Sequence, residues 1–279
     1  MRRVRIARRA AAVGVVAILC VAGLADAHDF FLVPGAFPFA GGADVEVLAH
    51  SSSRFPTSAG AVAATRIAKA VIIGSEGEAP ITDMSVRGTS LVLRSRPNGT
   101  GQRIVAVDLT SRSARQTSSD LLRWLKLEGA ADAAEHIEHG SALNGIDSVT
   151  RTDTKHAKTI FDVGQGGPRT FSRPSGQMIE FMPLQDPAAL RAGDTFRARL
   201  QFNGAPLPNV SVHASVPAPA DTAQKGEPDL HLVTDASGVV SLPVRKTGLW
   251  LIRTIHVVEA ARGNWETHWA SLVFRAGAQ

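Results

Sequence analysis

The sequence has 279 residues, with 30 basic and 25 acidic side chains, a formal net charge of +5 and a single cysteine. Five of the arginines and one of the aspartates fall within residues 1–27, so the other 252 residues carry 25 basic and 24 acidic side chains. This near balance argues against the basic face that nucleic-acid binding requires, and no nucleic acid is expected as a partner. The cysteine, Cys20, lies in the same segment, so the remainder has no disulfide and no cysteine-ligated metal.

Residues 1–27 have the three-part layout of a secretory signal peptide. Five arginines within Arg2–Arg9 precede an apolar run of about 15 residues, and Ala25-Asp26-Ala27 matches the A-x-A cleavage pattern. A bilayer-spanning helix needs roughly 20 apolar residues, and no later stretch reaches that length. We therefore expect export to the periplasm and a mature chain that begins at His28, with no transmembrane segment.

Residues 28–110 alternate short β-type runs with turn residues such as Pro97-Asn98-Gly99. Short strands at this spacing predict an N-terminal β-sandwich. The candidate strands are Phe30–Val33, Val45–His50, Ala68–Ile73, Ser90–Arg94 and Arg103–Leu109.

Residues 111–177 have a different texture and are predicted to form a helical insertion followed by a linker. Ser118-Ser119-Asp120 supplies capping residues before an apolar run, and Gly129 supplies a stop. Ala130–His139 continues in helix-forming residues, and Thr150–Ile160 is predicted to add another short helix. Glycines and prolines between residues 164 and 176 indicate the linker.

Residues 178–275 return to β-type runs separated by turn signals such as Asn203-Gly204 and Arg262-Gly263-Asn264, with a polar, proline-rich loop over Pro217–Pro228. They predict a C-terminal immunoglobulin-like or transthyretin-like β-sandwich. The mature chain is thus expected to be mainly β, with two sandwiches and a short helical segment between them. The strands in this part are Met178–Leu184, Thr195–Phe202, Val210–Ser215, His231–Thr234, Val239–Val244, Trp250–Val258 and Glu266–Phe274.

His28 is the first candidate metal ligand. Cleavage after Ala27 gives this residue an α-amine beside its imidazole, a chelating pair that suits Cu(II) or Ni(II). A third nitrogen from a distant histidine would complete the T-shaped arrangement called a histidine brace. The alternative is that cleavage happens to leave a histidine at the terminus.

Further candidates lie at strand positions near the two ends of the chain. His256 shares a strand face with Trp250 and Ile252, and it is either a neutral core-edge histidine or a ligand. Glu266 and His268 share the face that continues into an apolar core, where polar groups need partners such as a metal or an arginine. His50 ends a predicted strand and is either a solvated loop residue or directed into a site.

The remaining histidines and the known catalytic motifs indicate no further functional site. The histidines of Glu135-His136-Ile137-Glu138-His139 fit an exposed helix face, and His156, His213 and His231 are predicted to be surface residues. The sequence lacks the G-x-S-x-G elbow and any paired-carboxylate motif, so we expect a binding protein rather than an enzyme.

The mature start, His28-Asp29-Phe30-Phe31-Leu32, resembles the A-H-D-F-W-L opening of a bacterial domain-of-unknown-function family, DUF4198. Its members are often described as nickel-uptake, substrate-specific components or as periplasmic parts of nickel/cobalt transporters. Asp186-Pro187 and Gly248–Arg253 also match, and Asn264–Leu272 resembles the family's D-W-E-S-Y-W-A-S-L ending. The resemblance implies His28 and His256 as ligands, with His50 similar to a His-Pro-Phe segment of some relatives, and an inner-membrane metal transporter as partner.

Three functional hypotheses remain open at this point. The first is a periplasmic protein that binds a divalent transition metal (nickel, cobalt or copper) for uptake or handling, through His28, His50, His256, Glu266 and His268. The second is an envelope β-sandwich module that binds a protein or glycan partner without metal. The third is a copper oxidoreductase with a histidine brace.

Overall fold

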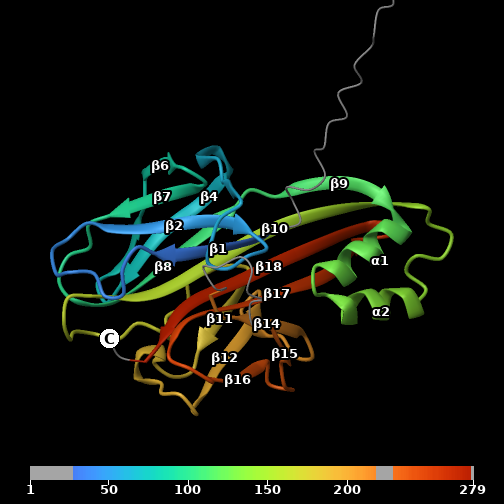
Figure 1. Cartoon of the computed structure of the whole chain (residues 1–279). Helices are drawn as coiled ribbons and strands as arrows, with labels where there is room; N and C mark the ends of the chain where they lie inside the picture. The colour runs from blue at the N-terminus through green and yellow to red at the C-terminus, as the bar shows by residue number, and fades with distance from the viewer. Residues whose placement is uncertain (1–27, 218–228, 278–279) are drawn as a thin grey trace, which may run out of the picture.

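The computed structural model describes residues 28–217 and 229–277 of the chain. The fold is mainly β, as the sequence predicts, and consists of three sheets in layers, with the largest between the other two (Figure 1). The predicted signal peptide, residues 1–27, and residues 218–228 of the predicted proline-rich loop lie outside the described residues.

The central sheet has nine strands and joins segments from both ends of the chain. Strands β10 and β18 pair in parallel, and the other pairs are antiparallel. In spatial order its strands are β15 (Leu230–Val233), β14 (Ser211–Ser215), β17 (Gly248–Ala261), β18 (Asn264–Ala276), β10 (Ser148–Val163), β8 (Gly101–Leu109), β4 (Ile67–Gly74) and β5 (Gly77–Pro80), with β9 (Arg112–Thr117) also paired to β10.

A smaller sheet covers each face of the central one. The first outer sheet comes from the N-terminal part and contains β1 (Asp29–Pro34), β2 (Val45–Ser52), β3 (Gly60–Ala61), β6 (Asp83–Arg87) and β7 (Ser90–Ser95). The second comes from the C-terminal part and contains β11 (Ile179–Pro183), β12 (Thr195–Phe202), β13 (Ala205–Pro206) and β16 (Val239–Pro243).

The continuous apolar run in β4 follows from this layering. Successive side chains of a strand point to opposite faces, so Ile72 packs in the core beneath the first outer sheet, whereas Val71 and Ile73 pack in the core beneath the second. A strand buried on both faces has no polar face to present, which explains why the run shows no alternation.

Two helices, α1 (Ser118–Leu127) and α2 (Ala131–His139), pack on one end of the central sheet (Figure 1). Thr117 caps α1 by accepting a hydrogen bond from the backbone N–H of Asp120. Gly129 follows α1 with φ at +92°, and a Cβ there would lie 2.7 Å from the His213 ring, so only glycine fits. No helix among the described residues is long and apolar enough to cross a membrane.

The predicted short helix over Thr150–Ile160 is wrong, because these residues lie within β10. Paired strands flank β10 on both sides, and its charged side chains are buried only where they have partners: Arg151 forms a two-bond ion pair with Asp153, and Lys158 pairs with Glu180. This pairing allows a polar sequence to occupy the middle of a sheet. The short strands β3, β5, β6, β9 and β13 were not predicted from the sequence.

Candidate functional site

Three histidines gather on one face of the central sheet, beneath the second outer sheet. His256 in β17 lies directly opposite His268 in β18, and His156 enters from β10, where it is paired with Ala270. Because side chains alternate along a strand, His156 and His268 point to the same face as Ala270. Side chains directly opposite each other have Cβ atoms about 5 Å apart and diagonal neighbours about 7–8 Å, within reach of imidazole rings.

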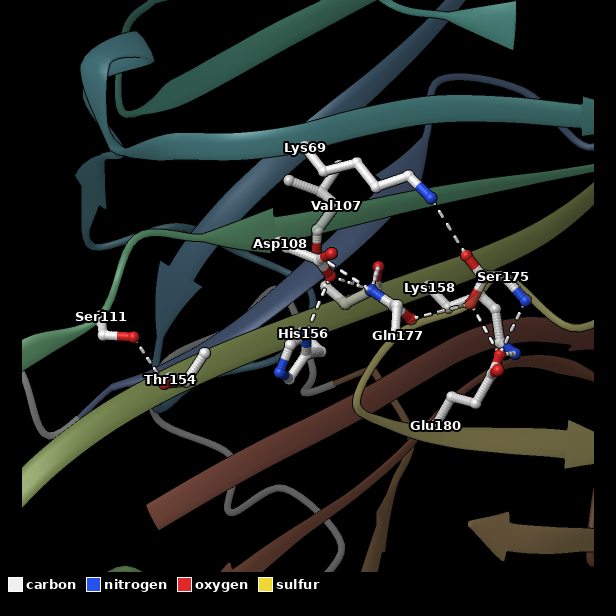
Figure 2. Close-up of polar contacts among 11 residues, drawn as sticks. Lys69, Val107, Asp108, Ser111, Thr154, His156, Lys158, Ser175, Gln177 and Glu180 are labelled. Carbon is white, nitrogen blue, oxygen red and sulfur yellow. Dashed lines mark hydrogen bonds and ion pairs between the residues drawn. The ribbon is translucent and has the colours of Figure 1, made fainter. Parts of the chain in front are cut away.

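His156 is held by a carboxylate beside it. Its Nδ1 lies 2.8 Å from Oδ1 of Asp108, and the same oxygen accepts a hydrogen bond of 2.7 Å from the side-chain amide of Gln177 (Figure 2). A nitrogen facing a carboxylate carries the proton, so Nε2 of the neutral ring has the lone pair. That Nε2 is buried and has no hydrogen-bond partner among the described residues.

His268 repeats this arrangement with its nitrogens exchanged. Its Nε2 lies 3.3 Å from a carboxylate oxygen of Glu266, so Nε2 is the proton donor and Nδ1 has the lone pair of the neutral ring. Nδ1 is buried and also lacks a partner within the described part of the chain. Burial lowers the pKa of the His268 imidazole, although the neighbouring Glu266 opposes this effect.

His256 lies at the edge of the group. Phe202, at the end of β12, packs against both facing histidines, with ring centroids 4.7 Å from His256 and 4.9 Å from His268. Burial, and secondarily the nearby His268, lower the pKa of His256 to about 4. The ring is therefore neutral at physiological pH, the form in which imidazole binds metals.

The structure thus brings together three of the five predicted site residues, His256, Glu266 and His268, and adds His156. His156 was predicted to be a surface residue, but its side chain is only 6% exposed. The alternation of β-branched Thr150, Thr152 and Thr154 was the sequence signal for the strand that buries it. Among the described residues, no three His, Cys, Asp or Glu side chains converge on one point as an ion would require.

His28 does not join this group. Its carbonyl oxygen accepts a 2.6 Å hydrogen bond from Nζ of Lys155, and the carbonyl of Phe30 accepts a 2.7 Å bond from the Ser271 hydroxyl. Lys155 directly precedes His156 in β10, and Ser271 directly follows Ala270 in β18. Successive side chains of a strand point to opposite faces, so Lys155 and Ser271 point to the face opposite the histidines. The central sheet therefore separates His28 from His256 and His268.

Arg253 is not a partner of Glu266 or His268, because it points to the face of the sheet opposite the histidines. Its guanidinium lies 3.0 Å from a carboxylate oxygen of Asp29 and 2.9 Å from one of Asp229. Burial raises the pKa of Asp29, and the Arg253 charge opposes that rise. The acidic residue next to His28 is thus used to fix the N-terminal strand.

His50 is neither a solvated loop residue nor a residue with an available nitrogen. Its side chain is buried, Nδ1 lies 2.8 Å from the carbonyl oxygen of Pro56, and Nε2 lies 2.9 Å from the hydroxyl of Ser90. Because the carbonyl can only accept, Nδ1 donates and Nε2 accepts from Ser90. Both ring nitrogens are used, which makes His50 a structural histidine that closes the loop after β2.

A buried ion pair between Lys158 of β10 and Glu180 of β11 lies beside His156. Lys158 donates to Glu180 over 2.7 Å, and Glu180 also accepts from the hydroxyl and the backbone N–H of Ser175 (Figure 2). Both side chains are nearly inaccessible, at 1% and 6% exposure. This pair fills the space between β10 and β11 beside His156 and anchors the second outer sheet next to the histidines.

The chain shows weak similarity to several solved structures. The D0-D1 domain of intimin matches with 15% identity, a TM-score of 0.20 and coverage of 88% of this chain and 97% of the other. The adhesin FdeC of Escherichia coli has 14% identity, a TM-score of 0.23 and coverage of 90% and 64%. An Escherichia coli alpha-2-macroglobulin has 11% identity, a TM-score of 0.23 and coverage of 88% and 15%.

No curated protein matches the sequence. A family model does, over residues 25–258, which include His28, His156 and His256, and its description is "Domain of unknown function (DUF4198)". The match covers most of the chain and contains strands from all three sheets. The chain belongs to the DUF4198 family.

Proposed function

We propose that this protein binds a divalent transition-metal ion in the periplasm, through the imidazoles of His156, His256 and His268. The observation that carries the proposal is the pair of buried lone-pair nitrogens, Nε2 of His156 and Nδ1 of His268, without hydrogen-bond partners among the described residues. A buried polar atom without a partner is costly, and an imidazole lone pair is a preferred ligand for nickel, cobalt and copper.

The surroundings of the two rings fit the same chemistry. In metal sites the second ring nitrogen of a ligating histidine usually donates to a carboxylate or carbonyl, which fixes the tautomer and orients the ring. Asp108 and Glu266 stand in that position for His156 and His268. His256 makes the third donor, and ion binding requires rotation of these side chains, because their nitrogens do not converge in the arrangement described.

The biological role follows from where the chain is expected to act. The sequence predicts export through an N-terminal signal, and the family resemblance points to nickel or cobalt handling. A protein that captures such an ion in the periplasm and delivers it to an inner-membrane transporter fits both. Copper remains in the candidate set, because imidazole sites favour copper over nickel and cobalt when geometry allows.

Isothermal titration calorimetry with Ni²⁺, Co²⁺ and Cu²⁺ on the exported, purified protein tests the proposal. We expect saturable binding of one ion, strongly weakened in His268→Ala and His156→Gln and unchanged in His139→Gln, an exposed histidine on α2. Asp108→Asn removes the carboxylate behind His156 and is expected to weaken binding about 10–100-fold.

The variant His28→Ala distinguishes binding at the three histidines from binding at the chain terminus. We expect unchanged affinity, since His28 lies on the opposite face of the central sheet. If His28→Ala abolishes binding while His268→Ala leaves it intact, the ion is held by the terminal amine and the proposal is wrong. Absence of binding to the wild-type protein would also refute it and would favour an envelope module that works without metal.

A further inference from the structure

The two lone-pair nitrogens of the histidine group are closed off in the arrangement described. Nε2 of His156 and Nδ1 of His268 are shielded from solvent, whereas His256 is half-buried and its ring nitrogens reach solvent. His256 therefore lies at the rim of the group, and the other two nitrogens lie further inside. An ion that enters from solvent meets His256 first, and a side chain must move before the ion reaches the inner nitrogens.

Phe202 contacts the rings of both facing histidines. It is half-buried at the end of β12, and the plane of its ring makes an angle of 65° with that of His256 and 52° with that of His268. Side chains packed in contact rotate only when their neighbours give way. The rotation that turns the nitrogens of His256 and His268 toward a common point therefore requires the Phe202 ring to move.

The backbone beside Phe202 is fixed, so the movement falls to the ring. Asn203 and Gly204 have φ angles of 51° and 78°, as a two-residue type I′ turn requires. A 2.7 Å hydrogen bond from the backbone N–H of Asn203 to the carbonyl of Met178 ties this turn to the residue before β11. Because the ring itself is only half-buried, it has room to swing toward solvent.

The histidine face continues beyond the rim into a part of the sheet that carries exposed oxygen atoms. Glu266, with a side chain 47% exposed, lies opposite Thr152 of β10. Thr154 lies opposite His268, and its hydroxyl is 2.8 Å from that of Ser111 in an exposed pair (Figure 2). A carboxylate at the rim attracts a divalent cation, so this side offers the approach to the histidines.

We propose that Phe202 is a lid over the histidine site, an inference that rests on the function proposed above. In the metal-free protein the Phe202 ring holds the two facing imidazoles apart from an ion. The ion approaches past Glu266, binds His256 and reaches the inner nitrogens once the ring swings out. The same movement is needed for entry and for exit, so the lid slows both. Phe202 is thus a positioning residue rather than a ligand.

Diethyl pyrocarbonate tests the cover without metal, because it acylates an imidazole at its unprotonated nitrogen. Peptide mass spectrometry follows the reaction of each histidine in the metal-free exported protein. We expect His156 and His268 to react at least 10-fold faster in Phe202→Ala than in the wild type. Phe171→Ala is the matched control and should leave both rates unchanged, since Phe171 packs on the same core but has no ring contact with a histidine among the described residues.

Stopped-flow mixing with Ni²⁺ tests the effect of the lid on the ion. Phe202→Ala is expected to raise the association and dissociation rate constants about 10-fold each and to leave Kd within about 3-fold of the wild-type value. Phe202→Leu keeps an apolar side chain at this position and should give intermediate rates. It also serves as the second variant should Phe202→Ala disturb the fold, which circular dichroism reports.

Unchanged histidine reactivity in both Phe202 variants, or an equal increase in Phe171→Ala, overturns the proposal. Nickel rate constants that stay at the wild-type values in both Phe202 variants overturn it as well. If the wild type binds no ion but Phe202→Ala exposes His156 and His268 to the reagent, the cover is confirmed and the proposed metal function is wrong. The two failures are therefore distinguishable.

Discussion

At the scale of single residues, the two faces of the central sheet carry different polar groups. One face holds histidines whose rings are hydrogen-bonded to the carboxylates of Asp108 and Glu266. The other holds the charged residues that fix the N-terminal strand, including Asp29, Lys155 and Arg253. A single strand, β10, contributes to both faces because its side chains alternate.

Glu128, at the end of α1, lies within electrostatic range of the charged residues on this second face. Burial raises the pKa of its carboxyl to about 7, with a further rise from Asp29, while Lys155, Arg253 and Arg151 act in the opposite direction. The folded protein therefore holds this proton at pH values where the unfolded chain, with a pKa near 4.5, has lost it. The stability contribution of the protonated group is present below pH 4.5 and is lost as the pH rises through 7.

The substitution Glu128→Gln should remove this loss of stability at high pH. We expect the variant to be more stable than the wild type at pH 8 and similar to it at pH 4.5, as measured by urea unfolding. Glu138→Gln on α2 is the matched control, because Lys126 lowers the pKa of Glu138, and it should bring no gain at pH 8. A Glu128→Gln effect of equal size at both pH values would show that the carboxyl does not titrate as described.

The sequence predicted part of the site at this scale. Period-two alternation placed Glu266 and His268 on the face that continues into the apolar core, and the structure agrees. The sequence did not indicate that His28 would lie on the other face of the sheet, because the packing of β1 depends on residues far along the chain, such as Ser271. His156 was missed for the same reason: its burial follows from strand pairing rather than from its neighbours.

At the scale of elements, β10 determines how the layers connect. It pairs with β18 over residues 150–159, with β9 over 148–153 and with β8 over 160–163. Its polar composition favoured a helix in the sequence prediction, whereas the apolar and alternating strands were predicted within a few residues of their observed bounds. A strand whose charges are buried in pairs carries no hydrophobic pattern from which it can be recognised.

Lys158→Met tests whether the buried pair holds β10 against β11. Removal of one partner leaves the Glu180 charge buried without compensation, so we expect a loss of about 3–5 kcal/mol in the free energy of unfolding. The double variant Lys158→Met/Glu180→Gln should recover much of that loss, because the glutamine is neutral and can still accept a hydrogen bond from Ser175. Chemical denaturation of both proteins measures the difference, and equal losses would contradict the assigned role.

At the scale of the whole molecule, the nine-stranded sheet joins the predicted N-terminal and C-terminal sandwiches. Strands β4 and β8 come from the first, β14, β17 and β18 from the second, and β10 connects them. Strands β4 and β8 contribute side chains to the cores beneath both outer sheets, so the core of the C-terminal half includes residues of the N-terminal half.

We therefore expect the described parts of the chain to unfold in a single transition. Circular dichroism, which reports on all strands, and tryptophan fluorescence, which reports mainly on the helical end of the sheet, should give coincident urea curves. The helical end contains Trp124, Trp265 and Trp269. Two separated transitions would show that the halves are independent despite the shared sheet.

The most direct test of the histidine site is a crystal structure of the exported protein grown with Ni²⁺, with diffraction data collected at the nickel absorption edge. The account predicts an anomalous peak about 2 Å from Nε2 of His156 and Nδ1 of His268, with the His256 ring turned toward it. A peak on the His28 amine, or no peak within bonding distance of His156 and His268 at saturating nickel, would contradict it.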